Sequence, residues 1–395
     1  MQAKNMSMSP EFSGFLDFVR WMAALLVVLQ HIRYLWFAEY ADIQNKTILF
    51  KLFYFLTGFG SEAVMVFFVL SGFLVGGGGL RKYRDGKYSV SDYFINRFSR
   101  IYTVLLPALI FGGLLDWIGL QYFNGTAIYT NSPLHPTRLL NFNISNQLDW
   151  PTFLANLVNL EGILTSHFGS NGPLWSLAYE WWYYCLFALI LELFRKKFTD
   201  LLFWIFVTGI LGAIIVLPIG LLLYMLIWGI GVLAAIINPE RIKFSPYIGC
   251  AMFILILIGS RLFHILLDKS DLPGMFIIGF FVNLLLAISF SLLIISLRKQ
   301  SFPNFQHLAF HKLMADFSYT VYLMHVPLLV FITAILSSNF GVPFFVQPTL
   351  QVFLISALLL LLIYVALYLY SRNTERFTPN IKACLTSLIT IKKTP

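Results

Sequence analysis

The sequence predicts an all-α polytopic membrane protein. Of its 395 residues, 58% are hydrophobic and only 11% are charged, whereas soluble globular proteins carry about 25% charged residues. The mean hydropathy is +0.78. Apolar runs long enough to cross a bilayer recur along the chain, since a membrane helix needs about 20 such residues. We therefore expect one integral membrane domain over residues 1–395, with about ten helices around a central cavity.

Apolar length places the membrane helices. The first run is too long for the apolar region of a signal peptide, so we expect it to remain in the membrane. A tight hairpin is expected at Leu217-Pro218-Ile219-Gly220, and one long polar segment, Gln121 to Pro173, interrupts the pattern. Over the whole chain, apolar length predicts ten membrane helices, at about 16–37, 52–75, 98–118, 175–194, 200–217, 220–237, 246–266, 274–297, 316–337 and 349–371.

The basic residues indicate the orientation. About 20 of the 27 Lys and Arg residues fall on the side of the N-terminus, the even-numbered loops and the tail. Because such residues concentrate on the cytoplasmic side, we expect both termini to be cytoplasmic, in the plasma (inner) membrane. The net charge of +9 then reflects membrane orientation and not nucleic-acid binding. The polar segment would lie outside, where His135 and His167 are expected to be ordinary loop residues.

Two further features receive structural interpretations. Cys185, Cys250 and Cys384 lie in or beside apolar stretches without metal-binding spacing, so we expect buried thiols and no metal site. The glycine run Gly76–Gly79 is expected to end the second helix as a flexible exit. A phosphate-binding loop is less expected, because its glycines would open a helix.

The first helix carries Asp17, Arg20 and His31 on one narrow face. Ionisable residues inside a membrane are costly and usually functional. A single histidine can simply form an interhelical hydrogen bond, but the shared face favours a polar cavity. A histidine near neutral pKa can act there as a general base.

Three later segments also carry polar side chains. Arg97 and Arg100, at the start of the third helix, suit either headgroup anchoring or phosphate binding. Glu180 shares a helix face with Ser176 and needs a partner in the membrane. Tyr322 and His325 lie close together in the ninth helix, where Pro327 is expected to kink the helix and free a carbonyl group.

These segments, in this order, resemble the membrane acyltransferase-3 family, which includes O-acetyltransferases of bacterial surface polysaccharides. The resemblance covers residues 16 to 327. It departs from the family pattern at Thr103, near which the family often has a proline, and after Glu180, where Trp181-Trp182 replace a polar residue. The matching motifs are Leu16-Asp17-Phe18-Val19-Arg20 with His31, Phe67-Phe68-Val69-Leu70-Ser71-Gly72-Phe73, Arg97-Phe98-Ser99-Arg100-Ile101, Pro173-Leu174-Trp175-Ser176-Leu177 with Glu180, and Ser318-Tyr319 through Tyr322-Leu323, His325 and Pro327.

The resemblance implies transfer of an acyl group, usually acetyl, from cytoplasmic acyl-CoA to a hydroxyl of an exported or cell-surface glycan or glycolipid. His31 would be the base and Glu180 would orient His31 or the acceptor. Arg20, Arg97 and Arg100 would bind the donor. The remaining supporting or acceptor-side candidates are Asp17, Trp175, Ser176, Tyr319, Tyr322 and His325. No permanently bound cofactor, metal or nucleic acid is expected.

Other interpretations remain open at the level of sequence. Intramembrane His, Arg and Glu residues would equally suit the proton relay of a proton-coupled transporter or flippase, although inverted repeats are not evident. An inactive relative that serves as an assembly partner would bind no acyl-CoA. Direct transfer and an acyl-histidine intermediate are both compatible with the residues. The acceptor, the acyl group and the oligomeric state are not determined by the sequence.

Overall fold

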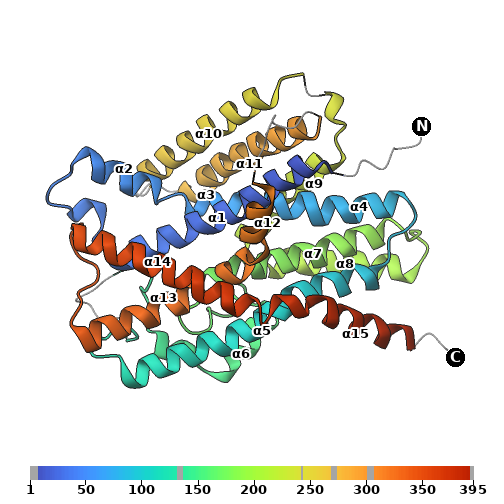
Figure 1. Ribbon diagram of the computed structural model, residues 1–395. Helices are drawn as coiled ribbons and strands as arrows, with labels where there is room; N and C mark the ends of the chain where they lie inside the picture. The colour runs from blue at the N-terminus through green and yellow to red at the C-terminus, as the bar shows by residue number, and fades with distance from the viewer. Residues whose placement is uncertain (1–7, 131–136, 242, 268–273, 300–306, 392–395) are drawn as a thin grey trace. The chain divides into compact units, whose positions relative to one another are not determined.

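The computed structural model describes residues 8–130, 137–241, 243–267, 274–299 and 307–391. The prediction of an all-α protein is confirmed, because α-helices joined by short 3₁₀ and π turns account for the regular structure of these residues (Figure 1). The helices are α1 (Pro10–Trp36), α2 (Ile48–Leu56), α3 (Gly60–Ser71), α4 (Gly77–Arg84), α5 (Val90–Tyr122), α6 (Trp150–Leu157), α7 (Trp175–Leu193), α8 (Leu201–Val216), α9 (Ile219–Ile236), α10 (Pro246–Leu267), α11 (Met275–Lys299), α12 (Leu308–Asp316), α13 (Ser318–Phe340), α14 (Leu350–Ser371) and α15 (Thr378–Ile391).

Within these described residues, eight helical stretches are long and apolar enough to cross a membrane. Each of the ten predicted helices has a counterpart, but α7 and α8 are not among the eight. Helix α8 has only 16 residues, and the first half of α7 carries Glu180 among several Trp and Tyr residues. Helices α6, α12 and α15 were not expected. The central cavity and the cytoplasmic termini stay predictions.

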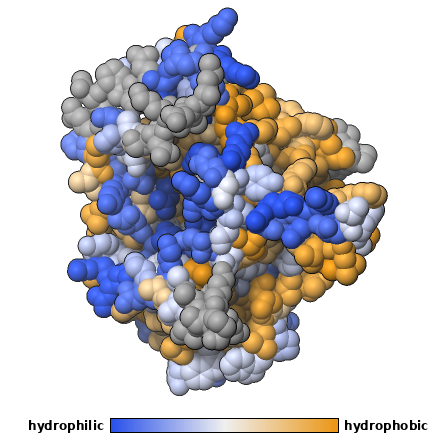
Figure 2. Space-filling view, turned by 90° about the vertical axis from the view of Figure 1, so that its right-hand side faces the viewer, coloured by the Kyte–Doolittle hydropathy of each residue, from blue (hydrophilic) through white to orange (hydrophobic). Residues whose placement is uncertain are grey.

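Apolar side chains cover much of the surface. On the face drawn in Figure 2, hydrophobic residues form broad continuous areas. On helix α14, Leu354, Leu358 and Leu361 are each more than half exposed. A water-soluble surface does not carry apolar patches of this extent, so the surface supports the membrane assignment.

Local sequence signals set several helix ends. Ser89 and Thr349 precede α5 and α14, and their side chains accept hydrogen bonds from Asp92 N and Val352 N. Such N-caps satisfy backbone N–H groups that have no partner inside the helix. Helix α13 ends at Gly341, which has φ +63°, a left-handed conformation that glycine adopts without strain. The predicted hairpin at Leu217–Gly220 is confirmed between α8 and α9.

The described residues form two compact units. The first contains Met1–Ala23, Ser61–Tyr88 and Tyr183–Asp316, and the second contains Ala24–Gly60, Ser89–Trp182 and Phe317–Pro395. In the first unit, α10 packs against α11 and α11 packs against α9. In the second, α13 packs against both α5 and α14, and α15 packs against α5.

The glycine run corrects a prediction. Gly76–Gly79 do not end a helix, because the chain continues from a π-helical turn (η2, Gly72–Gly76) into α4. A Cβ on Gly72 would overlap the carbonyl oxygen of Trp228, and one on Gly77 would overlap Ala235. The glycines therefore allow close approach of α9, as small residues do between membrane helices. The prediction of buried thiols was also wrong, since Cys185 and Cys250 are partly exposed and Cys384 is exposed.

Candidate functional site

The second unit brings together two histidines that are 294 residues apart in the sequence. His31 in α1 and His325 in α13 are joined by a 2.7 Å contact between Nδ1 of His31 and Nε2 of His325. Their rings are nearly parallel, with centroids 5.0 Å apart. His325 is fully buried, whereas His31 is partly exposed. The structure thus pairs two of the predicted site residues.

The backbone of α13 fixes the proton positions in this pair. Nδ1 of His325 lies 2.9 Å from the carbonyl oxygens of both Val321 and Tyr322. Because a carbonyl oxygen only accepts, Nδ1 of His325 carries the proton. A buried imidazole without an ion-pair partner in the described contacts is best accommodated as the neutral form, so its Nε2 accepts from Nδ1 of His31. This leaves a lone pair on Nε2 of His31.

A second contact joins α7 and α13. The hydroxyl of Tyr322 lies 2.6 Å from Oγ of Ser176, and it also donates to the carbonyl oxygen of Pro173 at 3.2 Å. Both side chains are buried. Since Tyr322 precedes His325 by three residues, it lies on the same face of α13. The predicted acceptor-side residues Ser176 and Tyr322 therefore adjoin the histidine pair.

Two carboxyl groups lie near tyrosines of α13. Glu180 is close enough to act electrostatically on both Tyr319 and Tyr322, and Glu161 acts on Tyr322. Glu161 is 3% exposed, and it accepts a hydrogen bond from the backbone N–H of Trp175, at the start of α7. Burial raises the pKa of Glu161 well above its ordinary value. The side chain of Trp175 packs against Tyr179.

The predicted donor-binding arginine Arg100 has an unexpected partner. Its Nη1 lies 2.8 Å from Oε2 of Glu375, in the 3₁₀ turn η6 (Glu375–Phe377). Oε1 of Glu375 accepts from the backbone N–H of Thr320 at 3.1 Å and from its hydroxyl at 2.6 Å. The guanidinium of Arg100 also lies over the ring of Tyr319, 5.1 Å from its centroid. Arg97, one turn earlier on α5, is partly exposed.

Asp17 and Arg20 belong to the first unit. Nη1 of Arg20 lies 3.5 Å from Oδ1 of Asp17, so the two residues form an ion pair on the same helix. Helix α1 continues without a break to His31, as the sequence predicted. The proposed contact of Arg20 with the donor stays a prediction.

The proline of α13 frees a carbonyl group, as expected. Pro327 has no N–H to donate to the carbonyl oxygen of Leu323. Instead, Nδ2 of Asn171 donates to that oxygen at 2.7 Å. Asn171 is 3% exposed and precedes the short turn η4 (Gly172–Leu174), which leads into α7. The proline thus helps to attach the start of α7 to α13, beside the Ser176–Tyr322 contact.

Sequence reasoning missed three residues of this region: Glu161, Asn171 and Glu375. Glu375 lies beyond the last predicted helix, which was expected to end at about residue 371, and no role was expected for it. Glu161 and Asn171 lie in the polar segment Gln121–Pro173, where amide side chains are common and carry no periodic signal, and where Asp149 and Glu161 are the two carboxyl residues. What distinguishes Glu161 and Asn171 from other polar residues of the segment is their burial, which the local sequence does not reveal. His167 of the same segment packs against Phe142, and His135 lies outside the described residues.

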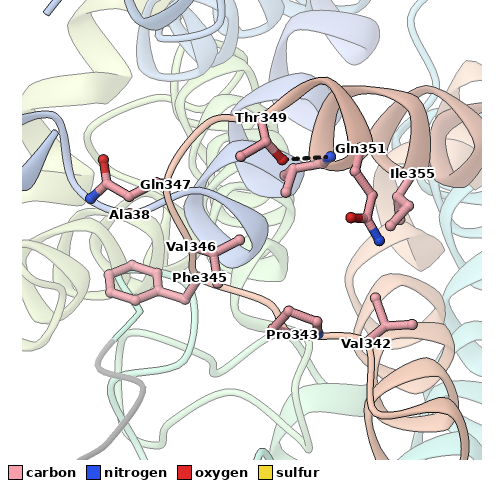
Figure 3. Close-up of a pocket in the computed structure, with 10 residues that line it drawn as sticks. Ala38, Val342, Pro343, Phe345, Val346, Gln347, Thr349, Gln351 and Ile355 are labelled. Carbon is pink, nitrogen blue, oxygen red and sulfur yellow. Dashed lines mark hydrogen bonds between the residues drawn. The ribbon is translucent and has the colours of Figure 1, made fainter. Parts of the chain in front are cut away.

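A cavity of about 530 Å³ lies at the connection between α13 and α14 (Figure 3). Val346 in this connection donates to the carbonyl oxygen of Trp36 at 3.1 Å, and Ala38 donates to Val346 at 2.9 Å. These two hydrogen bonds hold the wall of the cavity against the end of α1 that follows His31. Its wall includes Phe345 and Gln351. In the described part of the chain, no three His, Cys, Asp or Glu side chains gather closely enough to hold a metal ion.

Together, the apolar helices and the buried histidine pair define a multi-pass membrane protein with a polar site among its helices. Comparison with protein families gives a match to the family described as an acyltransferase domain, acyltransferase-3, over residues 13–369. Because this match covers most of the chain, the protein belongs to the acyltransferase-3 family. The family resemblance predicted from the sequence motifs is confirmed.

Two curated relatives match part of the chain. Acyltransferase MdmB from Streptomyces mycarofaciens is 34% identical over 201 residues, which cover 51% of this chain and 44% of that protein. An uncharacterized protein from Haemophilus influenzae is 28% identical over 153 residues, which cover 37% of this chain and 55% of that protein. The chain thus spans about half the length of the curated relatives it matches. The comparison with solved structures found no match.

Proposed function

We propose that this protein is an integral membrane O-acyltransferase. It moves an acyl group, most simply acetyl, from acyl-CoA on the cytoplasmic side to a hydroxyl of an exported or cell-surface glycan. Membership of the acyltransferase-3 family and the name of the relative MdmB support acyl transfer. The single observation that carries the mechanism is the 2.7 Å contact between Nδ1 of His31 and Nε2 of His325, from which we assign a lone pair to Nε2 of neutral His31.

The reaction follows from this geometry. Nε2 of His31 takes the proton of the acceptor hydroxyl as the oxygen attacks the thioester carbonyl, and the C–S bond then breaks. The same proton passes to the departing thiolate and gives free CoA. In the two-step variant, Nε2 itself attacks the thioester carbonyl and the C–S bond breaks, which gives an acyl-histidine and CoA thiolate. The acceptor hydroxyl then attacks the acyl group, the N–C bond breaks, and the hydroxyl proton neutralises the thiolate. His325 orients His31 in either route, so Glu180 is assigned to the acceptor side together with Ser176 and Tyr322.

The donor and acceptor approach from opposite ends of the site in this proposal. Arg97 and Arg100, near the cytoplasmic end of α5, suit the phosphates of CoA, because a guanidinium binds phosphate through two parallel hydrogen bonds. The polar segment Gln121–Pro173 and the cavity beside Phe345 suit an acceptor sugar on the outer face. Arg20 completes the donor path along α1, with Asp17 as its ion-pair partner.

The direct test measures donor binding and turnover in detergent. We expect purified protein to bind acetyl-CoA and to release CoA thiol, faster when a mixture of p-nitrophenyl glycosides is present. His31→Ala should lower kcat by about 10²–10⁴-fold, the usual contribution of a general base. The double variant Arg97→Ala/Arg100→Ala should instead weaken the binding of acetyl-CoA. A folded His31→Ala protein with full activity would exclude the assignment.

The test also addresses the transporter interpretation. Acylation in detergent needs no membrane potential, whereas coupled transport in vesicles is abolished by an uncoupler. Failure to bind acetyl-CoA, followed by failure with succinyl-CoA and longer acyl-CoA donors, would favour a transporter or an inactive assembly partner.

A further inference from the structure

A second cavity, of about 450 Å³, lies in the second unit between α5 and α15. Its volume is within the range of about 300–1,000 Å³ that is typical of small-molecule sites. The proposed mechanism uses none of its lining residues. They are Thr103, Pro107, Asn373, Thr374, Phe377, Asn380, Ile381 and Cys384.

The Arg100–Glu375 pair does not line this cavity, but it lies next to residues that do. Thr103 follows Arg100 by three residues and lies on the same face of α5, and Thr374 directly precedes Glu375. Two lining residues therefore adjoin the two members of the ion pair. A ligand in the cavity would have its end next to the guanidinium of Arg100.

Glu375 forms an ion pair with Arg100 through one nitrogen of its guanidinium group. One carboxylate oxygen is fixed by the backbone N–H and hydroxyl of Thr320, and the other contacts only Nη1 of Arg100. A guanidinium has five N–H donors, and the side chain of Arg100 remains 35% exposed. The carboxylate thus fixes the direction of the guanidinium while further donors face outward.

The cavity wall is mostly apolar and includes one aromatic ring and two asparagines, while the nearby arginines lie outside the wall. Phe377 is 42% exposed, and the guanidinium of Arg376 lies 4.9 Å from the centroid of its ring. Asn380 is exposed on α15, one turn after Phe377. Aromatic rings stack on the flat face of a nucleobase, and an asparagine amide matches the hydrogen-bonding edge of adenine. Arginines beside them suit phosphate groups.

We propose that the cavity between α5 and α15 receives the nucleotide end of the acyl-CoA donor, and that Glu375 is the positioning residue for Arg100. This proposal rests on the proposed function, since it assumes that acyl-CoA is the donor. It gives the segment after α14 a specific role: the adenine packs on Phe377 with Asn380 at its edge, and a phosphate contacts Arg100.

The test compares two donors that share the reacting thioester. Acetyl-CoA carries the nucleotide and its phosphates, whereas S-acetylpantetheine lacks both. Phe377→Ala should raise the KM for acetyl-CoA about tenfold, a typical loss of one base-stacking contact, with little change in kcat. Glu375→Gln should also raise the KM for acetyl-CoA about tenfold. Both variants should leave the KM for S-acetylpantetheine at the wild-type value, and Phe377→Trp should keep the wild-type KM for acetyl-CoA.

The control is Phe340→Ala, which removes another exposed phenylalanine, at the end of α13, and should change neither KM. Three results would overturn the proposal: equal wild-type KM values for the two donors, variants that lose both donors equally, or effects that occur only in anionic phospholipid vesicles and not in detergent. The last would identify a lipid-headgroup contact. If the wild type used neither donor, the proposed function itself would fail.

Discussion

The bond between the two histidines yields the sharpest prediction. His325→Phe keeps a ring of similar size in α13 but removes the nitrogen that accepts from Nδ1 of His31. The N–H of His31 then loses its partner in a partly buried site, and His31 is free to adopt the tautomer in which Nε2 carries the proton. That tautomer has no lone pair on Nε2 and is inactive as the proposed base.

The size of the effect follows from the 2.7 Å hydrogen bond. Leaving a buried polar group without its partner costs about 1–3 kcal/mol, and about 1.4 kcal/mol corresponds to a tenfold change in rate. We therefore expect kcat to fall about 5- to 150-fold, with the KM for acetyl-CoA unchanged. His325→Gln retains an amide oxygen as acceptor and should recover part of the activity.

The assay is release of CoA thiol from acetyl-CoA by purified protein, measured from pH 5.5 to pH 9. Thermal unfolding in the same detergent establishes that each variant is folded. The reasoning is refuted if folded His325→Phe keeps the wild-type kcat, or if the Gln variant is no more active than the Phe variant.

Three further predictions concern stability, and thermal unfolding in detergent measures each of them. Gly72→Ala should destabilise the first unit by about 1–3 kcal/mol through overpacking against Trp228. Gly209→Ala, which has open space around it, should not, and equal losses would contradict the packing argument. Asn171→Ala should cost about 1–3 kcal/mol by leaving the carbonyl of Leu323 without its donor. The loss should be smaller in a Pro327→Ala background, where the backbone N–H returns, so additive effects would disprove the coupling. Burial lowers the pKa of His167 to about 4. Its neutral form thus contributes up to about 3 kcal/mol that is complete above pH 6.5 and lost as the pH falls towards 4. His167→Phe should flatten this pH dependence, and an unchanged slope would show that another group causes it.

The sequence alone determined the class of fold. Apolar length is a local property, because a helix satisfies its own backbone hydrogen bonds in a membrane. Nine of the ten predicted segments coincide with single helices, whereas the segment 52–75 is divided between α2 and α3. Residue chemistry and spacing also selected His31, Ser176, Tyr322 and His325 as candidates. These signals are local as well: each polar residue is conspicuous within its own apolar run.

Tertiary structure decided which of these residues meet. His325 is the partner of His31, Glu375 is the partner of Arg100, and Asn171 satisfies the carbonyl that Pro327 frees. Helix periodicity gives the face of a residue on its own helix but not the neighbour across the interface. The glycine run shows the same limit, since only the approach of α9 explains why side chains are absent there. The partners were decided by packing between distant segments, and this packing also determines the proton positions and charges on which the proposed chemistry depends.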